Sequence, residues 1–182
     1  MAATALTSWQ AIVAGRERDK ADERFNQVRK LTHTILFEYH HEIIKLPGST
    51  PLLEKMVNNT LEYLDNLAPE SNGDKDLQSE IATAYQKIGD VQGNPYKGNL
   101  GNIEGAIVSY RKSLSIREKL VAENSHDAEM RRNLAKSYES IGDMLWTKGE
   151  YREAYSTYSQ NLRIHTELES SEESTIEDSY GI

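Results

Sequence analysis

Residues 138–158 read YESIGDMLWTKGEYREAYSTY, and this stretch decides the fold of the chain. It begins with an aromatic residue, continues with Ile-Gly-Asp, and places an alanine four residues before its last tyrosine. The strings YQKIGDVQG (85–93) and GNIEGAIVSY (101–110) show the same features earlier in the chain. Small side chains let two helices approach closely, and aromatic side chains fill the space that remains between them. The recurrence therefore predicts pairs of helices that pack on one another.

The two copies share the same kinds of residue at matching positions. We expect the glycines and alanines to lie where helices come closest, and the aromatic and isoleucine side chains to fill the interior between them. A helical repeat buries its apolar face only against the next repeat. The expected packing residues are Tyr85, Ile88, Gly89, Ala106 and Tyr110 in the first copy and Tyr138, Ile141, Gly142, Ala154 and Tyr158 in the second.

The second copy resembles the tetratricopeptide repeat, whose pattern is W-x2-L-G-x2-Y, then A-x3-F, then Pro. Residues 138–158 meet this pattern at almost every position except the proline. The first copy departs at Gln92, where an apolar residue is expected, and has about five extra residues in the loop 93–102. Tyr85 and Tyr138 are 53 residues apart, whereas the usual repeat has 34. The resemblance therefore implies a tetratricopeptide-type array with elongated helices.

Apolar residues at intervals of three and four predict six amphipathic helices, over residues 22–45, 51–68, 76–92, 103–120, 127–147 and 151–169. Thr50 is the expected N-cap of the second helix, and Asn124 or Ser125 that of the fifth. Gly149 separates the last two helices. No segment alternates apolar and polar residues as a strand does. The predicted fold class is all-α, with three antiparallel helical hairpins stacked as a short tetratricopeptide-type solenoid.

The expected organisation places an extension at each end of the three hairpins. Residues 1–21 form either an N-terminal helical extension or the stub of a membrane span, because MAATALTSWQAIVAG is apolar but too short to cross a bilayer. Residues 170–182 form an acidic flexible tail, either solvated or folded back over the last helix. Between them lie a degenerate or capping hairpin (22–68), a linker (69–75), a tetratricopeptide-like hairpin with a loop insertion (76–122) and a tetratricopeptide repeat (123–169).

Composition and motifs argue against several classes of function. The net charge of −8 disfavours nucleic acid as a partner, because phosphate binding needs a basic surface. The chain has no cysteine, so disulfides, thiolate metal sites and a cysteine nucleophile are excluded. Kinase motifs, Walker motifs and a local Ser-His-Asp signature are absent. The five histidines lack acidic residues at the spacing of a metal site. We therefore expect no catalytic residue, cofactor or metal.

A second resemblance covers roughly residues 9–169. The strings RFNQVRKL (24–31), LPGST (46–50) and GDVQGNPY (89–96) are similar to the C-terminal region of bacterial transmembrane serine/threonine protein kinases. In those proteins a kinase domain and a membrane span precede tetratricopeptide repeats. The resemblance implies a sensor or scaffold region, soluble as given, that follows the membrane span, although the kinase domain is not in this chain. Any membrane contact would come through a segment preceding residue 15, and the side of the membrane stays open.

The tetratricopeptide resemblance also implies a ligand groove lined by the first helix of each hairpin. Acidic residues stand where relatives that bind a terminal carboxylate carry basic ones, so a neutral or basic protein segment is the favoured ligand. Trp146 is a candidate aromatic anchor. The alternative is that these side chains are simply solvated. The candidate groove residues are Thr83, Gln86, Asp90, Lys136, Glu139, Asp143 and Trp146.

The last predicted helix has more apolar surface than one neighbour can cover. Repeat arrays usually end in a polar capping helix, and none follows here. Self-association through the C-terminal hairpin, or cover by the acidic tail, is the expected consequence. Two functions remain: a non-catalytic module that binds a protein or peptide, and a structural module that only drives homo-oligomerisation. The apolar residues in question are Tyr155, Tyr158, Leu162, Ile164 and Leu168.

Overall fold

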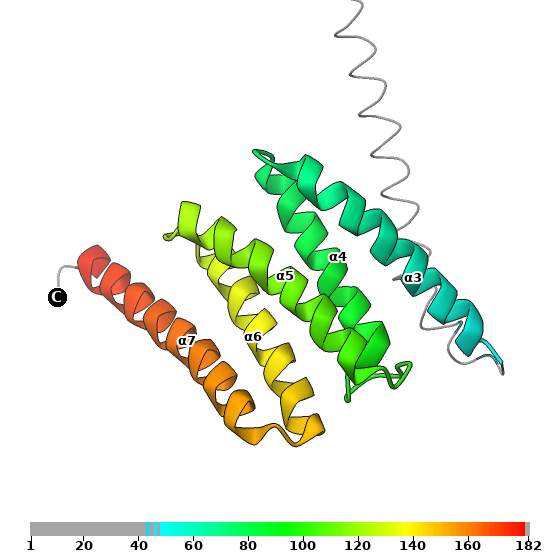
Figure 1. Ribbon diagram of the computed structural model, residues 1–182. Helices are drawn as coiled ribbons and strands as arrows, with labels where there is room; N and C mark the ends of the chain where they lie inside the picture. Colours follow the sequence, from blue (N-terminus) through cyan, green and yellow to red (C-terminus); the bar gives the residue numbers. More distant parts are fainter. Residues whose placement is uncertain (1–42, 44–45, 47, 181–182) are drawn as a thin grey trace, which may run out of the picture. The chain divides into compact units, whose positions relative to one another are not determined.

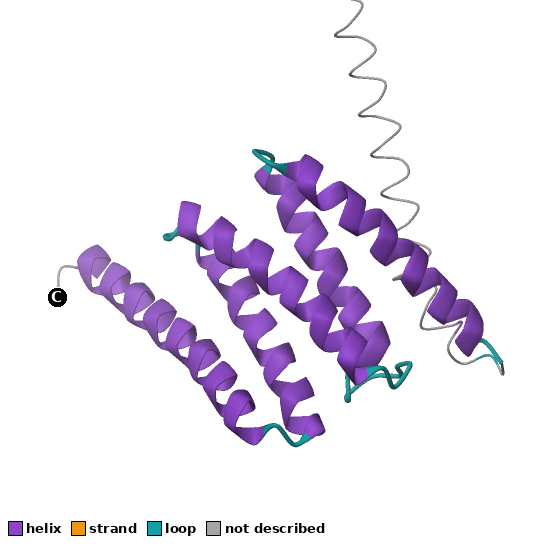
Figure 2. Cartoon of the chain, viewed as in Figure 1, coloured by secondary structure: helices purple, strands orange, loops and turns teal. Residues whose placement is uncertain are grey.

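The structure, a computed structural model, describes Ile43, Leu46 and residues 48–180, with side chains as far as Ser171. This part of the chain contains five α-helices, one short 3-10 helix and no strand, which confirms the predicted all-α class (Figure 2). The helices are α3 (Thr50–Leu67), the 3-10 helix η2 (Ala68–Ser71), α4 (Lys75–Gly93), α5 (Ile103–Glu123), α6 (Ala128–Lys148) and α7 (Tyr151–Tyr180) (Figure 1).

Helices that follow one another in the sequence pack against one another. The most extensive contacts join α4 to α5 and α6 to α7, and α5 also packs against α6. The contact between α3 and α4 is smaller. Figure 1 shows this succession in colour order from α3 to α7. The interior therefore forms between successive helices instead of around one central element.

Two apolar clusters hold α5, α6 and α7 together. The first contains the alanine and tyrosine of the earlier motif copy together with the alanine of the later copy, and the second lies toward the other end of α6. Burial of the leucine, isoleucine and methionine side chains in these clusters stabilises the fold by roughly 1.5–3 kcal/mol each. The first cluster consists of Ala106, Ile107, Tyr110, Ile141, Met144, Leu145 and Ala154. The second consists of Leu134, Ala135, Ile164 and Leu168.

The buried positions of α3 recur in α5 at a constant shift of 53 residues. This is the interval that separates Tyr85 from Tyr138, so α3 and α5 occupy equivalent places in the sequence repeat. The buried positions match even where the residues are polar or charged. Their burial is therefore set by where they lie in the helix and not by the type of residue. The corresponding buried pairs are Leu53 and Ala106, Val57 and Tyr110, Thr60 and Ser113, Leu64 and Arg117, and Leu67 and Leu120.

Two helix starts differ from the sequence predictions. Helix α3 has Ser49 as its N-cap instead of Thr50, and no side-chain oxygen caps it. Pro51 removes one of the N–H groups that would need such a cap. Helix α6 is capped by Asp127, whose carboxylate accepts from the N–H of Met130 at 2.9 Å. Asn124 ends α5 instead, so the expectation that Asn124 or Ser125 caps α6 is wrong.

The predicted break between the last two helices is present at Gly149. Its φ of 84° lies in the left-handed region, where a glycine meets no steric penalty at a helix C-terminus. Helix α7 then continues to Tyr180, beyond the predicted end near residue 169. Residues 170–180 are thus helical where an irregular tail is expected. No glycine or proline interrupts this stretch before Gly181, so the helix has no stop signal there.

The loop between α4 and α5 folds back onto the end of α4. The N–H groups of Leu100 and Asn102 donate to the carbonyls of Val91 and Gln92, at 2.9 and 2.8 Å. The Asn102 side chain then caps α5 by accepting from the N–H of Gly105 at 2.9 Å. The expected loop insertion is therefore a hydrogen-bonded connection between two helices.

The predicted segment 1–21 and, apart from Ile43, the predicted helix 22–45 lie outside the described residues. Among the residues that are described, no helix has the length and apolar character needed to cross a membrane. All of them belong to one compact unit, His41–Ile182.

Candidate functional site

Tyr110 of α5 lies over Gly89 of α4. A Cβ at Gly89 would come within 2.5 Å of ring atom Cε1 of Tyr110, a distance that real side chains do not adopt. The Tyr110 hydroxyl donates to Oδ1 of Asp90, the residue after this glycine, at 2.7 Å. The glycine thus provides the space for the ring, and the aspartate binds its polar end.

The same unit recurs between α6 and α7. Tyr158 lies over Gly142, where a Cβ would come within 2.6 Å of the tyrosine Cε1. Its hydroxyl donates to Oδ1 of Asp143, again the residue after the glycine, at 2.7 Å. Ala106 and Ala154 are fully buried in the first apolar cluster. The glycines, alanines and tyrosines of both motif copies therefore lie at helix contacts.

The two aspartates differ in how many partners they have. Oδ1 of Asp90 accepts from Tyr110 and from Asn94 at 3.1 Å, and Oδ2 pairs with Lys97 at 2.8 Å. Burial alone would raise the pKa of Asp90, but the bonds from Lys97, Tyr110 and Asn94 outweigh it and hold the pKa below 3.8. Within the described residues, Asp143 accepts only at Oδ1. Asp143 therefore keeps one oxygen for another partner, whereas Asp90 does not.

The first tyrosine of each copy makes a second repeated contact. Tyr85 donates to Oδ1 of Asp65 in α3 at 2.6 Å, and Tyr138 donates to Oε1 of Glu118 in α5 at 2.8 Å. Both acids stand 20 residues before their tyrosine. Lys112 pairs with Asp65 and lies over the Tyr85 ring, 5.3 Å from its centre. Neither acid was predicted from the sequence, although their common spacing of 20 residues before the tyrosine was a signal for them.

Gln86 is an interior residue, so its expected place in a ligand groove is wrong. Its side chain is 4% exposed, and its amide donates to Oγ of Ser140 at 2.7 Å. Its Oε1 accepts from Arg117 at 3.2 Å. The neighbouring candidate Thr83 is half-buried and donates to the carbonyl of Ser79. Because both side chains are already hydrogen-bonded, α4 has few polar groups left that could bind a ligand.

Arg117 joins three helices from an interior position in α5. One of its guanidinium nitrogens donates to Oγ of Ser137 at 2.7 Å and to the carbonyl of Asn133 at 2.8 Å, both in α6, as well as to Gln86 in α4. Burial lowers the pKa of Arg117 to about 10. Each of these contacts is to a neutral group, so their role is to fix the position of the guanidinium between the helices.

The remaining candidates form a line on one face of α6, which we call the α6 surface. Its residues are Lys136, Glu139, Asp143 and Trp146, spaced three or four apart. All but Asp143 are exposed, and the Trp146 side chain is 59% exposed. The Trp146 ring meets Tyr151 of α7 edge to face, with ring centres 4.9 Å apart. An acidic pair thus lies beside an exposed aromatic pair.

A second exposed apolar line runs along α7, and we call it the α7 stripe. It consists of Tyr151, Tyr155 and Leu162, whose exposed fractions are 59%, 77% and 66%. Ile164 and Leu168, which the sequence analysis grouped with them, are buried against α6. The last helix therefore covers only part of its apolar surface within this unit.

The described residues contain no group of three or more His, Asp or Glu side chains that could hold a metal ion. His33, His40 and His41 lie outside them, and His126 and His165 are exposed. A scan of protein-family models and searches of curated proteins and of solved structures found no match to this chain. The geometry of the helices and their surfaces is therefore the basis for a functional assignment.

Proposed function

We propose that this chain is a non-catalytic protein-binding module, built as a helical repeat array of the tetratricopeptide type. Four observations support the array. The glycine–aspartate–tyrosine unit occurs twice with the same hydrogen bond, at 2.7 Å each time. The acid–tyrosine contact also occurs twice, and the buried positions of α3 and α5 share one register. Successive helices pack on one another, as stacked helical hairpins would.

The single observation that carries the binding function is the exposed Trp146–Tyr151 pair next to Asp143 and Glu139. Large aromatic side chains at the surface are typical anchors of protein interfaces, because they bury much area at a small cost in conformational entropy. One carboxylate oxygen of Asp143 has no partner among the residues that the structure describes, and Glu139 is exposed. A neutral or basic protein segment fits this surface, whereas an acidic segment would meet like charge.

The experiment measures binding of labelled peptides by fluorescence anisotropy, with basic, neutral and acidic sets matched in length and apolar content. We expect the basic and neutral sets to bind and the acidic set not to bind. Trp146→Ala should weaken binding at least about tenfold, which corresponds to the loss of one interface anchor. Asp143→Asn should weaken only the basic set. Val108→Ala, at another exposed apolar position, is the matched control. Equal binding by wild type and Trp146→Ala would contradict the proposal.

The second resemblance extends the proposal to a place in a larger protein. The strings at 24–31, 46–50 and 89–96 support an origin as the sensor or scaffold region that follows the membrane span of a bacterial serine/threonine kinase. The reading frame upstream of Met1 tests this directly. It should encode a kinase domain and then a membrane span, and an unrelated upstream sequence would contradict the kinase origin without affecting the binding proposal.

Homo-oligomerisation is the second candidate function, and the α7 stripe favours it. Tyr110 and Tyr158 are equivalent, so positions in α5 and α7 correspond at a shift of 48 residues. The stripe residues Tyr151, Tyr155 and Leu162 then correspond to Ile103, Ile107 and Leu114 of α5. All three α5 residues belong to, or pack against, the apolar cluster that α6 completes. A second copy of the chain could cover the stripe as α6 covers these residues.

A further inference from the structure

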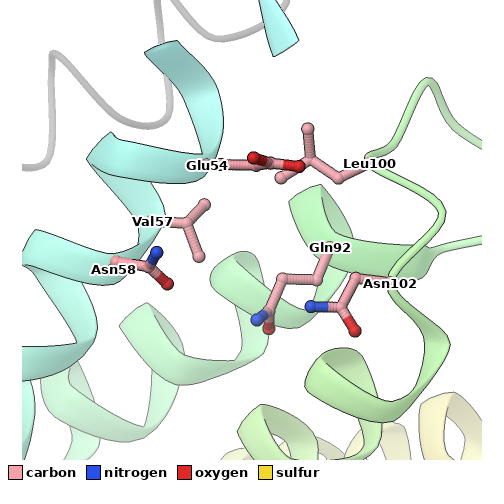
Figure 3. A pocket seen from close by; sticks show the side chains of 6 residues that line it. All are labelled: Glu54, Val57, Asn58, Gln92, Leu100 and Asn102. Atoms are coloured by element: carbon pink, nitrogen blue, oxygen red, sulfur yellow. The ribbon is translucent and has the colours of Figure 1, made fainter. Parts of the chain in front are cut away.

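A small hollow lies where α3 meets the end of α4 and the loop that leads to α5 (Figure 3). Its volume is about 140 Å³, which is enough for a small polar group but not for a large ligand. Val57 and Leu100 provide aliphatic wall. The polar residues that line it are Glu54, Asn58, Gln92 and Asn102.

Two side-chain amides bring N–H donors to this hollow. Gln92 is 4% exposed, and its Oε1 accepts from the hydroxyl of Ser109 at 2.6 Å. Its NH₂ group has no hydrogen-bond partner in the described part of the chain, and its nitrogen is not fully buried, so a ligand in the hollow can reach it. Asn102 uses its Oδ1 to cap α5, which leaves its NH₂ group as a donor. Figure 3 shows the Asn102 amide nitrogen turned toward the Gln92 side chain.

Two residues of α3 bring acceptors to the other side. Glu54 and Asn58 are one helical turn apart, and both are exposed. Neither side chain has a hydrogen-bond or ion-pair partner among the described residues. Glu54 offers only acceptors when ionised, whereas Asn58 offers one acceptor and two donors. The hollow thus has two amide donors on the α4 and loop side, and on the α3 side an acceptor from each residue together with the Asn58 NH₂ group.

We infer that this hollow is a binding site for a primary carboxamide, the group at the end of an asparagine or glutamine side chain. The carbonyl oxygen of the ligand accepts from the NH₂ groups of Gln92 and Asn102. Its own NH₂ group donates to the Glu54 carboxylate and to Oδ1 of Asn58. The methylene groups of the ligand contact Val57 and Leu100. This ligand pairs both amide NH₂ groups of the α4 and loop side and an acceptor from each of the two α3 residues, and the Asn58 NH₂ group stays exposed to solvent.

Other small groups match the site less well. A carboxylate would accept from Gln92 and Asn102 but would face the negative charge of Glu54. A guanidinium has only donors, so it would leave the two amide NH₂ groups without acceptors. A site built from hydrogen-bonding groups rejects such analogues strongly, because its own polar groups then stay unpaired. The site is on α3, α4 and the loop from α4 to α5, so the inference does not depend on the α6 surface.

The test is a titration of the ¹⁵N-labelled full chain, followed by the amide signals in NMR spectra. The probes are N-acetylglutamine methylamide and the otherwise identical N-acetylglutamate methylamide. With the glutamine probe we expect saturable shifts of the Asn58, Gln92 and Asn102 side-chain amides. The glutamate probe should bind at least about tenfold more weakly, which is the effect of one unfavourable polar contact.

Two variants locate the binding, with one matched control. Glu54→Ala and Asn58→Ala change exposed positions of α3, so both variants should fold, and each should weaken the glutamine probe at least about threefold. Glu62→Ala, two helical turns further along α3, should leave binding unchanged. Three results would each overturn the inference: equal affinity for the two probes, shifts that do not saturate, or unchanged binding in both pocket variants.

Discussion

Tyr158 lies so close to Gly142 that any side chain at the glycine would overlap the tyrosine ring, since a Cβ there would be 2.6 Å from ring atom Cε1. The hydroxyl of the same tyrosine is bound by Asp143 at 2.7 Å. Gly142 thus sets the distance between α6 and α7, and Asp143 sets the position of the Tyr158 ring. The equivalent relationship between Gly89, Asp90 and Tyr110 joins α4 to α5.

Gly142→Ala should destabilise the fold although alanine favours helices. Alanine in place of glycine in a helix gains roughly 0.5–1 kcal/mol, whereas forcing a methyl group into a packed contact typically costs about 1–3 kcal/mol. We expect a net loss of up to about 2.5 kcal/mol in the free energy of unfolding, measured with urea. In a Tyr158→Leu background the same change should cost clearly less, because the ring is gone. Equal costs in the two backgrounds would show that the ring contact has no energetic importance.

The raised pKa of Tyr138 predicts that the fold loses stability at alkaline pH. Burial, together with the bond to Glu118, raises the pKa of Tyr138 from 10.0 to about 12. A group whose pKa is raised by folding stabilises the fold fully below its unfolded pKa, and this contribution is lost as pH rises through the folded value. Stability should therefore fall between pH 10 and 12, and tyrosinate absorbance should report the titration. Tyr138→Phe should remove part of this fall, and an unchanged pH profile would contradict it.

Arg117 should stabilise the fold mainly because its side chain fills space and joins α4, α5 and α6, and less because of its positive charge. Arg117→Ala removes the donor to Ser137, the Asn133 carbonyl and Gln86, and it leaves a cavity. We expect a loss of about 2–4 kcal/mol in urea unfolding. Arg117→Met fills most of the volume and should lose less, since the equivalent residue in α3 is Leu64. A methionine variant no more stable than the alanine variant would show that the hydrogen bonds dominate.

The α7 stripe predicts self-association that depends on Leu162. Light scattering coupled to size exclusion should show a mass that rises with concentration for the wild type. Leu162→Arg should abolish that rise, because it places a charge in the contact between copies. Val108→Arg, at a comparably exposed position of α5, is the control and should behave as the wild type. A wild type that stays monomeric at high concentration would exclude the homo-oligomer function.

Within residues 48–180, the sequence was sufficient to predict the helices and their closest contacts, because both depend on local spacing. The intervals that relate Gly89 to Tyr110 and Gly142 to Tyr158 are visible in a single chain. The ends of the helices were harder to predict from the sequence. Asn124, Ser125 and Asp127 all offer oxygens that can cap α6, and the backbone path between α5 and α6 determines which of them does so. The length of α7 was underestimated because its apolar pattern stops before the helix does.

The polar interior was not predictable in the same way. Gln86 occupies a position typical of a groove residue, yet the arginine that binds it stands 31 residues away in the sequence. Pairing at that distance has no local pattern. One signal was available, because Arg117 falls among buried positions of α5 that continue to Leu120. A cation at such a position predicts a polar partner on a neighbouring helix, and Gln86 and Ser137 are those partners.

The two copies of the tyrosine–aspartate bond differ in one respect. Tyr110 stands 20 residues after Asp90, whereas Tyr158 stands 15 residues after Asp143, and the helix contact is the same in both. The connection between paired helices can therefore change in length without a change in packing. The exposed turn at Tyr96, before the hydrogen-bonded part of this connection, is accordingly the place to insert foreign peptides or reporters, because the contacts of Leu100 and Asn102 can then stay intact.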